Sequence, residues 1–199
     1  MYSYFRMKTN PLNSQELIRR SQAGDPEAFS DLFEGYKNLV YRTAYLMLGN
    51  LEEAEDALQE IFVQLYRSLA TYQASKAAFT TWLYQVTVNH CLNRRRPYRP
   101  LILPLEAADT KVMAEYDSRM GSTWEEAESI RQVLLGLSDK LRAVIVLRYY
   151  ADLSYAEIAQ SLEIPLGTVK SRLDLALKTM RKTLQSDPAS IWTDQEVIK

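Results

Sequence analysis

Two stretches of the 199-residue chain carry basic, hydroxyl, amide and aromatic side chains at helical spacing. In residues 169–184, apolar residues recur every three or four positions, which predicts a helix with one buried face. The opposite face carries cations and a hydroxyl, the groups that contact phosphates and base edges. The apolar positions are Val169, Leu173, Leu177, Met180 and Leu184, and the polar ones are Lys170, Ser171, Arg172, Lys178, Arg181 and Lys182.

A short helix and a turn precede this basic helix. Ser154 and Glu157 have the spacing of a capping box, which predicts a helix start. Pro165 has no backbone N–H and interrupts the helix, so we expect the second helix to begin near Gly167 or Thr168. This order indicates a helix-turn-helix whose second helix enters the DNA major groove. The alternative is an ordinary helical hairpin with a solvated charged face.

The second stretch, residues 79–95, is predicted to be a helix with Phe79, Leu83, Val86 and Cys91 facing inward. Rings, amides and arginines occupy its other positions. Rings stack on unpaired bases, amides read base edges and arginines hold phosphates, so the stretch suits single-stranded nucleic acid. The alternative is that Trp82 and Tyr84 are core residues. The polar and aromatic positions are Thr80, Thr81, Trp82, Tyr84, Gln85, Asn89, Arg94, Arg95 and Arg96.

A third stretch, residues 51–69, predicts an amphipathic helix whose outer face is acidic in its first half. Carboxylates at a helix start can simply complement the helix dipole. The same charges could also dock a basic protein surface, and the residues alone leave both interpretations open. The outer positions are Glu52, Glu53, Glu55, Asp56, Gln59 and Glu60.

Turn and capping signals place these stretches in an all-helical chain. A helix is expected at 14–21, and Asp25-Pro26 starts another that ends at Gly49, where Asn50 caps the next. Residues 71–78 read as a loop. After Pro97 and Pro100, residues 98–122 read as a linker.

Two more helices are expected before the helix-turn-helix, one capped by Thr123 and ending near Gly136, and one over 139–150 capped by Ser138. No strand pattern competes with these helices. We predict an all-α fold of two small helical domains, 1–97 and 123–185, joined by a flexible linker over 98–122 and followed by a tail, 186–199.

Composition favours an intracellular binding protein. Residues 101–130 carry a net charge of −5, between two segments of +2 each, so an acidic connector separates two nearly neutral units. Cys91 is the only cysteine, which excludes an internal disulfide. No apolar run has membrane-spanning length and no signal-peptide pattern is present, so we expect a cytoplasmic protein without membrane insertion.

The residues give no indication of an enzyme. We find no Gly-rich phosphate loop and no nucleophile paired with a base in sequence context. His90 is the only histidine and has one cysteine beside it, so we expect no metal site, no cofactor and a helix-surface position for His90. A stand-alone DNA-binding regulator would use only the helix-turn-helix, and it would leave the acidic helix and the helix from Trp82 to Arg96 unexplained.

Three motifs together resemble bacterial RNA polymerase sigma factors of the extracytoplasmic-function (ECF) group over nearly the whole chain. AEDALQEIFVQLYR (54–67) is similar to region 2.2, and FTTWLYQVTVNHCLNRRRP (79–97) to regions 2.3 and 2.4. LRYYADLSYAEIAQSLEIPLGTVKSRL (147–173) is similar to region 4. The order of the motifs and the missing intermediate domain also fit this group.

The resemblance implies three binding surfaces. The first docks on the coiled coil of the polymerase clamp, with Glu52, Asp56, Gln59 and Glu60. The second melts the −10 element and captures an unstacked base, with Tyr72, Gln73, Ser75, Lys76, Thr80, Trp82, Tyr84, Gln85, Asn89, Arg94, Arg95 and Arg96. The third reads the −35 element, with Arg148, Thr168, Lys170, Ser171, Arg172, Asp174 and Lys178.

The implied partners are core RNA polymerase, through its β′ clamp coiled coil and its β flap, promoter DNA, and an anti-sigma factor that competes with the polymerase. One departure affects the −35 element. Members of the family frequently have another basic or aromatic residue where this chain has Asp174 and Leu175. An acid can accept a hydrogen bond from cytosine N4, so the −35 sequence of better-known relatives cannot be assumed for this chain.

Overall fold

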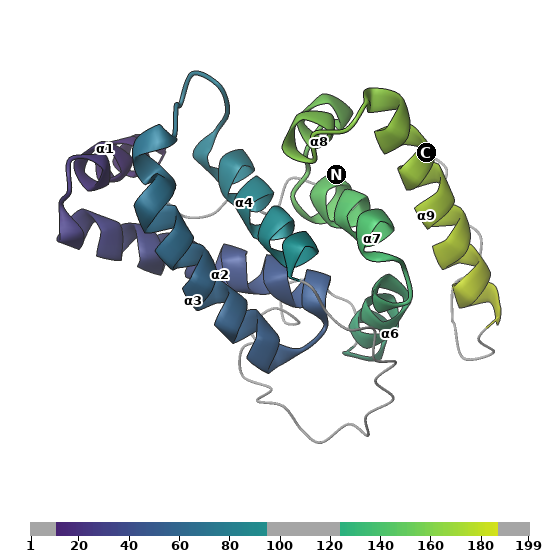
Figure 1. Cartoon of the computed structure of the whole chain (residues 1–199). Helices are drawn as coiled ribbons and strands as arrows, with labels where there is room; N and C mark the ends of the chain where they lie inside the picture. The colour runs from purple at the N-terminus through teal and green to yellow at the C-terminus, as the bar shows by residue number, and fades with distance from the viewer. Residues whose placement is uncertain (1–10, 95–123, 187–199) are drawn as a thin grey trace.

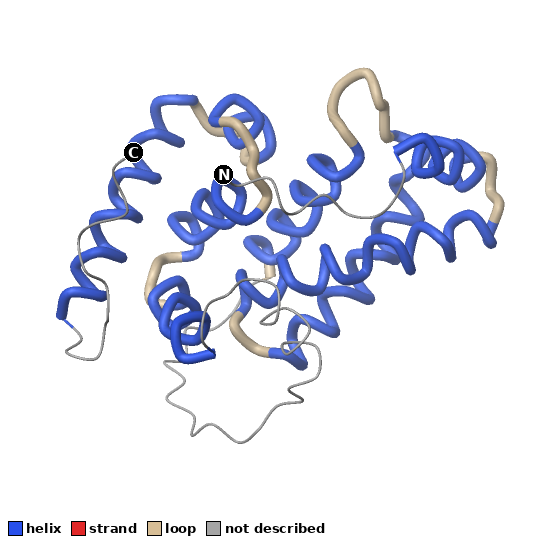
Figure 2. The backbone as a smooth tube through the Cα atoms, turned by 180° about the vertical axis from the view of Figure 1, so that it is seen from behind, coloured by secondary structure: helices blue, strands red, loops and turns tan. Residues whose placement is uncertain are grey.

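The chain folds into two helical units, and the computed structural model describes residues 11–94 and 124–186 (Figure 1). The first unit contains α1 (Pro11–Gln22), α2 (Pro26–Leu48), α3 (Leu51–Ser68), a 3₁₀ turn (Leu69–Thr71) and α4 (Phe79–Asn93). The second contains α6 (Trp124–Leu135), α7 (Asp139–Ile145), a π-helical turn (Val146–Tyr150), α8 (Tyr155–Ser161) and α9 (Leu166–Ser186). The all-α prediction is confirmed, and the described residues contain no strand (Figure 2).

Most predicted helix bounds agree with the structure to within a few residues. The α1 helix begins at Pro11 rather than Ser14, α9 begins at Leu166 rather than Gly167 or Thr168, and α4 ends at Asn93 rather than near Arg95. The helix expected over 139–150 changes from α-helix to a π-helical turn after Ile145. The predicted linker, the Thr123 cap and nearly all of the predicted tail lie outside the described residues.

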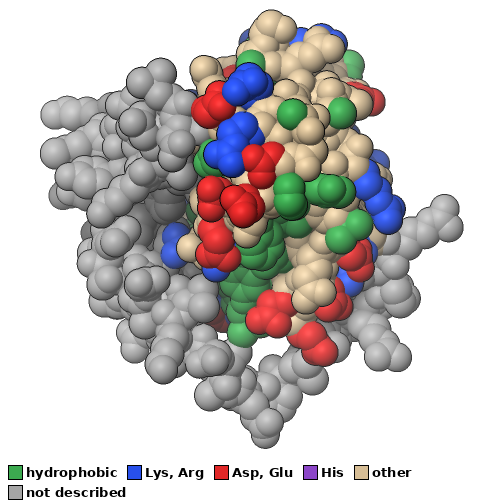
Figure 3. All heavy atoms as spheres, turned by 90° about the vertical axis from the view of Figure 1, so that its left-hand side faces the viewer, with side chains coloured by type: hydrophobic (Ala, Val, Ile, Leu, Met, Phe, Trp, Pro, Cys, Tyr) green, Lys and Arg blue, Asp and Glu red, His purple; other side chains and the backbone are tan. Residues whose placement is uncertain are grey.

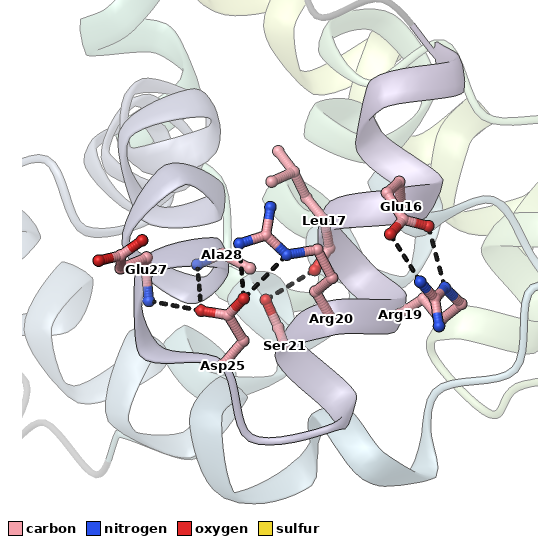
Figure 4. A network of polar contacts seen from close by, with 8 residues as sticks. All are labelled: Glu16, Leu17, Arg19, Arg20, Ser21, Asp25, Glu27 and Ala28. Carbon is pink, nitrogen blue, oxygen red and sulfur yellow. Dashed lines mark hydrogen bonds and ion pairs between the residues drawn. The ribbon is translucent and has the colours of Figure 1, made fainter.

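The start of α2 is fixed by Asp25 and Pro26, as predicted. Asp25 Oδ1 accepts hydrogen bonds from the backbone N–H groups of Glu27 at 3.0 Å and Ala28 at 3.2 Å. The other carboxylate oxygen accepts from Arg20 Nε at 2.8 Å and Nη2 at 2.6 Å, which ties the end of α1 to the start of α2 (Figure 4). Backbone and Arg20 hydrogen bonds lower the pKa of Asp25, so the cap stays ionised at neutral pH.

A tight corner joins α2 to α3. Gly49 ends α2 with φ of +75°, a left-handed conformation that favours glycine, and its N–H donates to Tyr45 O. Asn50 then caps α3 by accepting from the Glu53 N–H at 2.9 Å. Leu135 of the second unit packs directly against Gly49. Any other residue at position 49 would therefore have a strained backbone, and its Cβ would clash with Leu135.

The helix-turn-helix is formed by α8 and α9. Ser154 and Glu157 make the predicted capping box at the start of α8. Glu163 has a left-handed φ of +52° in the turn, and the Ile164 N–H donates to Ala159 O at 3.0 Å. Pro165 precedes α9 and its carbonyl accepts from the Thr168 N–H at 2.8 Å, so the chain turns without leaving these backbone groups unpaired.

A continuous apolar core holds both units together. In the first unit α2 is central and packs against α1, α3 and α4, and in the second α9 packs against α7 and α8 (Figure 1). The units also contact each other, since α2 packs against α6 and α7, and α4 against α7 and α8. Within the described residues, no helix has the length and apolar character needed to cross a membrane.

Candidate nucleic-acid interface

The second helix of the helix-turn-helix, α9, presents the expected polar face. Val169 and Leu173 are buried, whereas Lys170, Ser171, Asp174 and Lys178 are exposed. The predicted inner face is wrong at Leu177, which is 42% exposed, because Ala176 takes the buried position between Leu173 and Met180. A period of 3.6 residues selects 169, 173, 176 and 180 as one face.

Two predicted −35 residues are an ion pair in this structure. Lys178 Nζ lies 2.8 Å from Asp174 Oδ2, one helical turn apart on the exposed face of α9. Exposed pairs of this kind contribute at most about 1 kcal/mol, so the pair can exchange for contacts with DNA. In this structure Asp174 therefore holds the Lys178 side chain on the exposed face of α9, where its carboxylate remains a hydrogen-bond acceptor.

Arg148, a predicted −35 residue, contacts the segment that leads into α8. Its Nη1 donates to Leu153 O at 3.0 Å and lies 3.8 Å from Asp152 Oδ1. The guanidinium also lies over the Tyr155 ring, 5.5 Å from its centroid. These contacts hold the start of the helix-turn-helix, and the side chain remains about one-third exposed at 35%.

A hollow lies between the loop over 72–77 and the start of α4. Tyr72 and Trp82 form an aromatic wall with ring centroids 5.1 Å apart, and Phe79 packs edge-on against Tyr72 at 5.3 Å. Tyr72 Oη donates to Ala77 O at 3.0 Å and closes the loop on itself. The residues that line the hollow are Thr71, Tyr72, Gln73, Lys76, Ala77, Trp82, Gln85 and Gln160.

Side chains from α1 fix the position of this loop. Gln22 Nε2 donates to the carbonyls of Leu69 and Tyr72, each at 3.0 Å. Tyr36 Oη also donates to Ser14 Oγ at 3.2 Å, so α1 is bonded to α2 as well as to the loop. The backbone of Tyr72, which carries one ring of the aromatic wall, is therefore fixed by α1, and α1 is itself bonded to α2.

The structure brings together some of the predicted −10 residues and separates others. Tyr72, Gln73, Lys76, Trp82 and Gln85 line one hollow, where rings, amides and an ammonium suit an unpaired base beside a phosphate. Ser75 and Thr80 do not line it. Tyr84 and Asn89 lie where α4 contacts the second unit. Arg95 and Arg96 lie outside the described residues.

Arg94 contacts the acidic helix rather than open solvent. Its Nη1 donates to Glu53 O at 2.8 Å, and its Nη2 lies 3.4 Å from Asp56 Oδ2 and 3.9 Å from Glu60 Oε1. A predicted phosphate-binding residue thus neutralises two predicted docking residues. This contact could not be predicted from local sequence patterns, because 38 residues separate Arg94 from Asp56.

His90 joins the same cluster, and the expected helix-surface position was wrong. Its side chain is 16% exposed, and Nε2 lies 3.1 Å from Glu60 Oε2. Burial lowers the pKa of His90 from its ordinary value of 6.5, although the Glu60 carboxylate acts in the opposite direction. His90 is therefore mainly neutral at pH 7, between α3 and α4.

We expect the folded protein to lose stability as His90 is protonated. A lowered folded-state pKa means that the unfolded chain binds more protons, so the free energy of unfolding falls as pH decreases below about 6.5. Thermal unfolding should be measured between about pH 7.5 and 5.5, where few carboxylates titrate. The His90→Gln variant should show a weaker pH dependence, and parallel curves for the two proteins would contradict the assignment.

The exposed face of α3 combines acids with apolar side chains. Glu52, Asp56 and Gln59 are exposed, and Val63 and Tyr66 continue the same helical face at 52% and 58% exposure. Figure 3 looks at the side where α1, α2 and α3 lie and shows acidic side chains next to apolar surface. Val63 and Tyr66 were missed from the sequence, although the spacing from Glu52 onward could have identified them.

Comparison with known proteins identifies both units. Residues 32–99 match the Sigma-70 region 2 family, and residues 127–180 match the family Sigma-70, region 4. Over 178 residues the chain is 36% identical to the ECF RNA polymerase sigma factor SigW of Bacillus subtilis, a match that covers 84% of this chain and 95% of SigW. It is 32% identical over 191 residues to the ECF RNA polymerase sigma-E factor of Escherichia coli K12, covering 87% and 95%.

Solved structures agree on the fold. CnrH in complex with the cytosolic domain of CnrY matches with a TM-score of 0.62 at 20% identity, covering 88% of this chain and 99% of CnrH. The sigma factor RpoE in complex with the anti-sigma factor NepR from Bartonella quintana matches with a TM-score of 0.60 at 17% identity, covering 80% and 98%. These likenesses concern the helical architecture alone.

The two helical units with their DNA-binding elements define a transcription factor of the sigma-70 class. Within that class the chain belongs to the ECF RNA polymerase sigma factors. It directs promoter-specific transcription initiation by RNA polymerase, and its family acts as transcription regulators.

Proposed function

We propose that α9 reads the −35 element while the hollow beside α4 captures an unpaired base of the −10 element. The observation that carries the −10 assignment is the hollow, where the Tyr72 and Trp82 rings meet the polar side chains of Gln73, Lys76 and Gln85. A base must leave the duplex before such a wall can stack on it and an amide can read its pairing edge.

Two other surfaces of the chain are proposed to bind the polymerase. The acidic and apolar face of α3 is proposed to dock on the β′ clamp coiled coil, and the second unit on the β flap. RNA synthesis itself belongs to the polymerase, so this chain needs no cofactor or metal, and it acts in the cytoplasm. Because CnrH and RpoE were solved with CnrY and NepR, an anti-sigma factor is also proposed for this chain.

The test is promoter selection from a random template library by core polymerase loaded with this chain. Transcripts should share two separated sequence elements upstream of their start sites. Core polymerase alone is the control and should select no such pair. Enrichment of one element only, or of none, would contradict the proposed division between the two units.

The Arg172→Ala variant should weaken binding at the −35 element and leave the −10 element unaffected. Arg172 lies on the half-exposed side of α9, between Ser171 and the buried Leu173. Losing a base or phosphate contact there should cost about 1–3 kcal/mol, or about 5–150-fold in affinity. Holoenzyme binding should be compared on a duplex −35 template and on a pre-melted −10 strand, with Arg181→Ala as a control on the same helix.

Equal losses on the two templates would indicate a folding defect, and the assignment of Arg172 to the −35 element would then be withdrawn. A loss with Arg181→Ala as large as that with Arg172→Ala would point to a general electrostatic effect. Salt must be held constant throughout, because phosphate contacts make affinity strongly salt-dependent.

A further inference from the structure

Asp174 is the only acidic residue of α9, and it lies on the side of the helix that faces away from the core. Ser171, Asp174 and Lys178 are spaced by three and four residues on this side, and all three are exposed. The side chain of Asp174 is 63% exposed. A helix-turn-helix places this side of its second helix in the major groove, so the carboxylate would lie among base edges.

The distance along α9 places Asp174 near base edges and Lys178 nearer a phosphate backbone. The helix begins at Leu166 and rises about 1.5 Å per residue, so Asp174 lies about 12 Å from this start and Lys178 about 18 Å. The major groove is about 12 Å wide, and the N-terminal residues of a recognition helix contact its base edges. Lys178 is therefore placed toward the edge of the groove, where phosphates lie.

The contact with Lys178 makes an acid tolerable near DNA. Phosphates repel a carboxylate, and Lys178 Nζ neutralises it from 2.8 Å away at Asp174 Oδ2. An ionised carboxylate has two acceptor oxygens, so Oδ2 can stay bonded to Lys178 while Oδ1 accepts from a base. Exposed pairs four residues apart add little to stability. Removing the carboxylate should therefore leave the fold intact, and its effect on DNA binding can be measured by itself.

A carboxylate in the major groove favours one base. Guanine presents the acceptors N7 and O6 there, and thymine presents the acceptor O4 and a methyl group, so both repel an anion. Adenine presents an amino donor beside the acceptor N7, whereas cytosine presents its N4 amino donor alone. Asp174 should therefore accept from cytosine N4 and reject guanine and thymine most strongly.

We propose that Asp174, held by Lys178, makes the −35 element of this chain require a cytosine at one position. The proposal rests on the proposed function of α9 as the reader of that element, and it names the base that one residue of the helix selects. Lys178 is a positioning residue, because it fixes and neutralises the carboxylate rather than choosing the base. The contact is separate from the one assigned to Arg172.

The test is promoter selection from a random template library by core polymerase loaded with the natural chain or with a variant. The natural chain should select cytosine at one −35 position, and exchange of that base should weaken holoenzyme binding about 5–150-fold. Asp174→Asn should change the selected base to adenine, because an amide binds adenine N6 and N7. Asp174→Ala should accept all four bases at that position and keep the rest of the element.

The matched control is Asp31→Asn, which removes the same charge from an exposed position of α2 and should select the same sequence as the natural chain. Lys178→Gln should weaken binding about tenfold in the natural background, because the carboxylate is no longer neutralised. In the Asp174→Asn background, where no carboxylate remains, the same change should weaken binding only about twofold. Equal losses in the two backgrounds would overturn the role of Lys178.

The requirement for cytosine is overturned if the natural chain selects no cytosine in the −35 element, or if Asp174→Asn selects the same base as the natural chain. Circular dichroism should show that each variant remains folded. The base exchange uses the natural chain, so the test stays valid if a variant fails to fold. If the natural chain selects no recurrent sequence upstream of the −10 element, the proposed function of α9 fails instead, and the two failures are thereby distinguished.

Discussion

Replacing Arg142 with alanine is expected to lower the free energy of unfolding by about 3–5 kcal/mol, because several buried carbonyls lose their donor. The side chain is 8% exposed and donates to the last carbonyls around α6, at 3.0 Å to Leu134 O and 2.9 Å to Leu135 O. It also donates to Leu137 O at 2.9 Å and to Met47 O at the end of α2. The last turn of a helix has no intrahelical partners for its carbonyls, so one guanidinium satisfies the ends of two helices.

Without Arg142 the carbonyls of Leu135, Leu137 and Met47 would lose this donor, whereas Leu134 O would keep the Leu137 N–H at 3.1 Å. Each unpaired buried group costs about 1–3 kcal/mol, although such losses are not additive. Thermal unfolding should therefore begin about 6–20 °C lower. Urea unfolding followed by circular dichroism gives the free energy itself. Lys140→Ala, on the exposed side of the same helix, is the control and should change stability by less than about 0.5 kcal/mol.

Arg142→Lys tests the reason for the effect. A lysine keeps the charge but lacks the planar fork that reaches several carbonyls, so it should recover only part of the lost stability. Full recovery by lysine would show that charge near the helix ends is sufficient. A loss below about 1 kcal/mol in the alanine variant would show that water satisfies these carbonyls when the side chain is removed.

Reversing the charges of Glu52 and Asp56 together should reduce affinity for core polymerase by about 30–150-fold. Both are exposed on the face of α3 that continues into Val63 and Tyr66. Attraction to a basic partner becomes repulsion at two places, which together costs about 2–3 kcal/mol. The Glu52→Lys/Asp56→Lys protein should be titrated with core polymerase, with fluorescence anisotropy as the signal.

The matched control is Asp31→Lys/Glu34→Lys, which makes the same change in net charge at exposed acids of α2. It should bind core polymerase nearly as tightly as the natural chain. Equal losses in the two double variants would mean that net charge, rather than the α3 face, governs docking. Asp56 also lies near Arg94, so circular dichroism must show that the α3–α4 contact tolerates the change.

Local signals predicted the helices well, because the groups that end a helix lie within a few residues of it. Asp25, Gly49, Asn50 and Ser154 each act as the sequence indicated. The contacts between distant segments could not be predicted in this way. Asn89 and Ser161, like Arg94 and Asp56, are polar pairs whose residue types fit a DNA or protein surface equally well.

Only part of the candidate site could be predicted, because some of its residues come from segments that are distant in the sequence. The loop over 72–77 and Trp82 were identified through the family motif, and the structure places them around one hollow. The motif does not show where the second helical unit packs. In the structure this unit adds Gln160 to the lining of the hollow, and its Tyr150 packs against Tyr84. Arg142 was overlooked because a buried arginine surrounded by apolar residues breaks the pattern that otherwise identifies a core helix.

The two hydrogen bonds from Gln22 to the carbonyls of Leu69 and Tyr72 make α1 part of the folded unit that holds the hollow. The region 2 match starts at residue 32, after the whole of α1. A minimal fragment cut at that boundary would keep α3, the loop and α4 but would lose the anchor that holds Tyr72 in the aromatic wall. For the base capture proposed above, the smallest autonomous unit therefore extends further toward the N-terminus than the region 2 match.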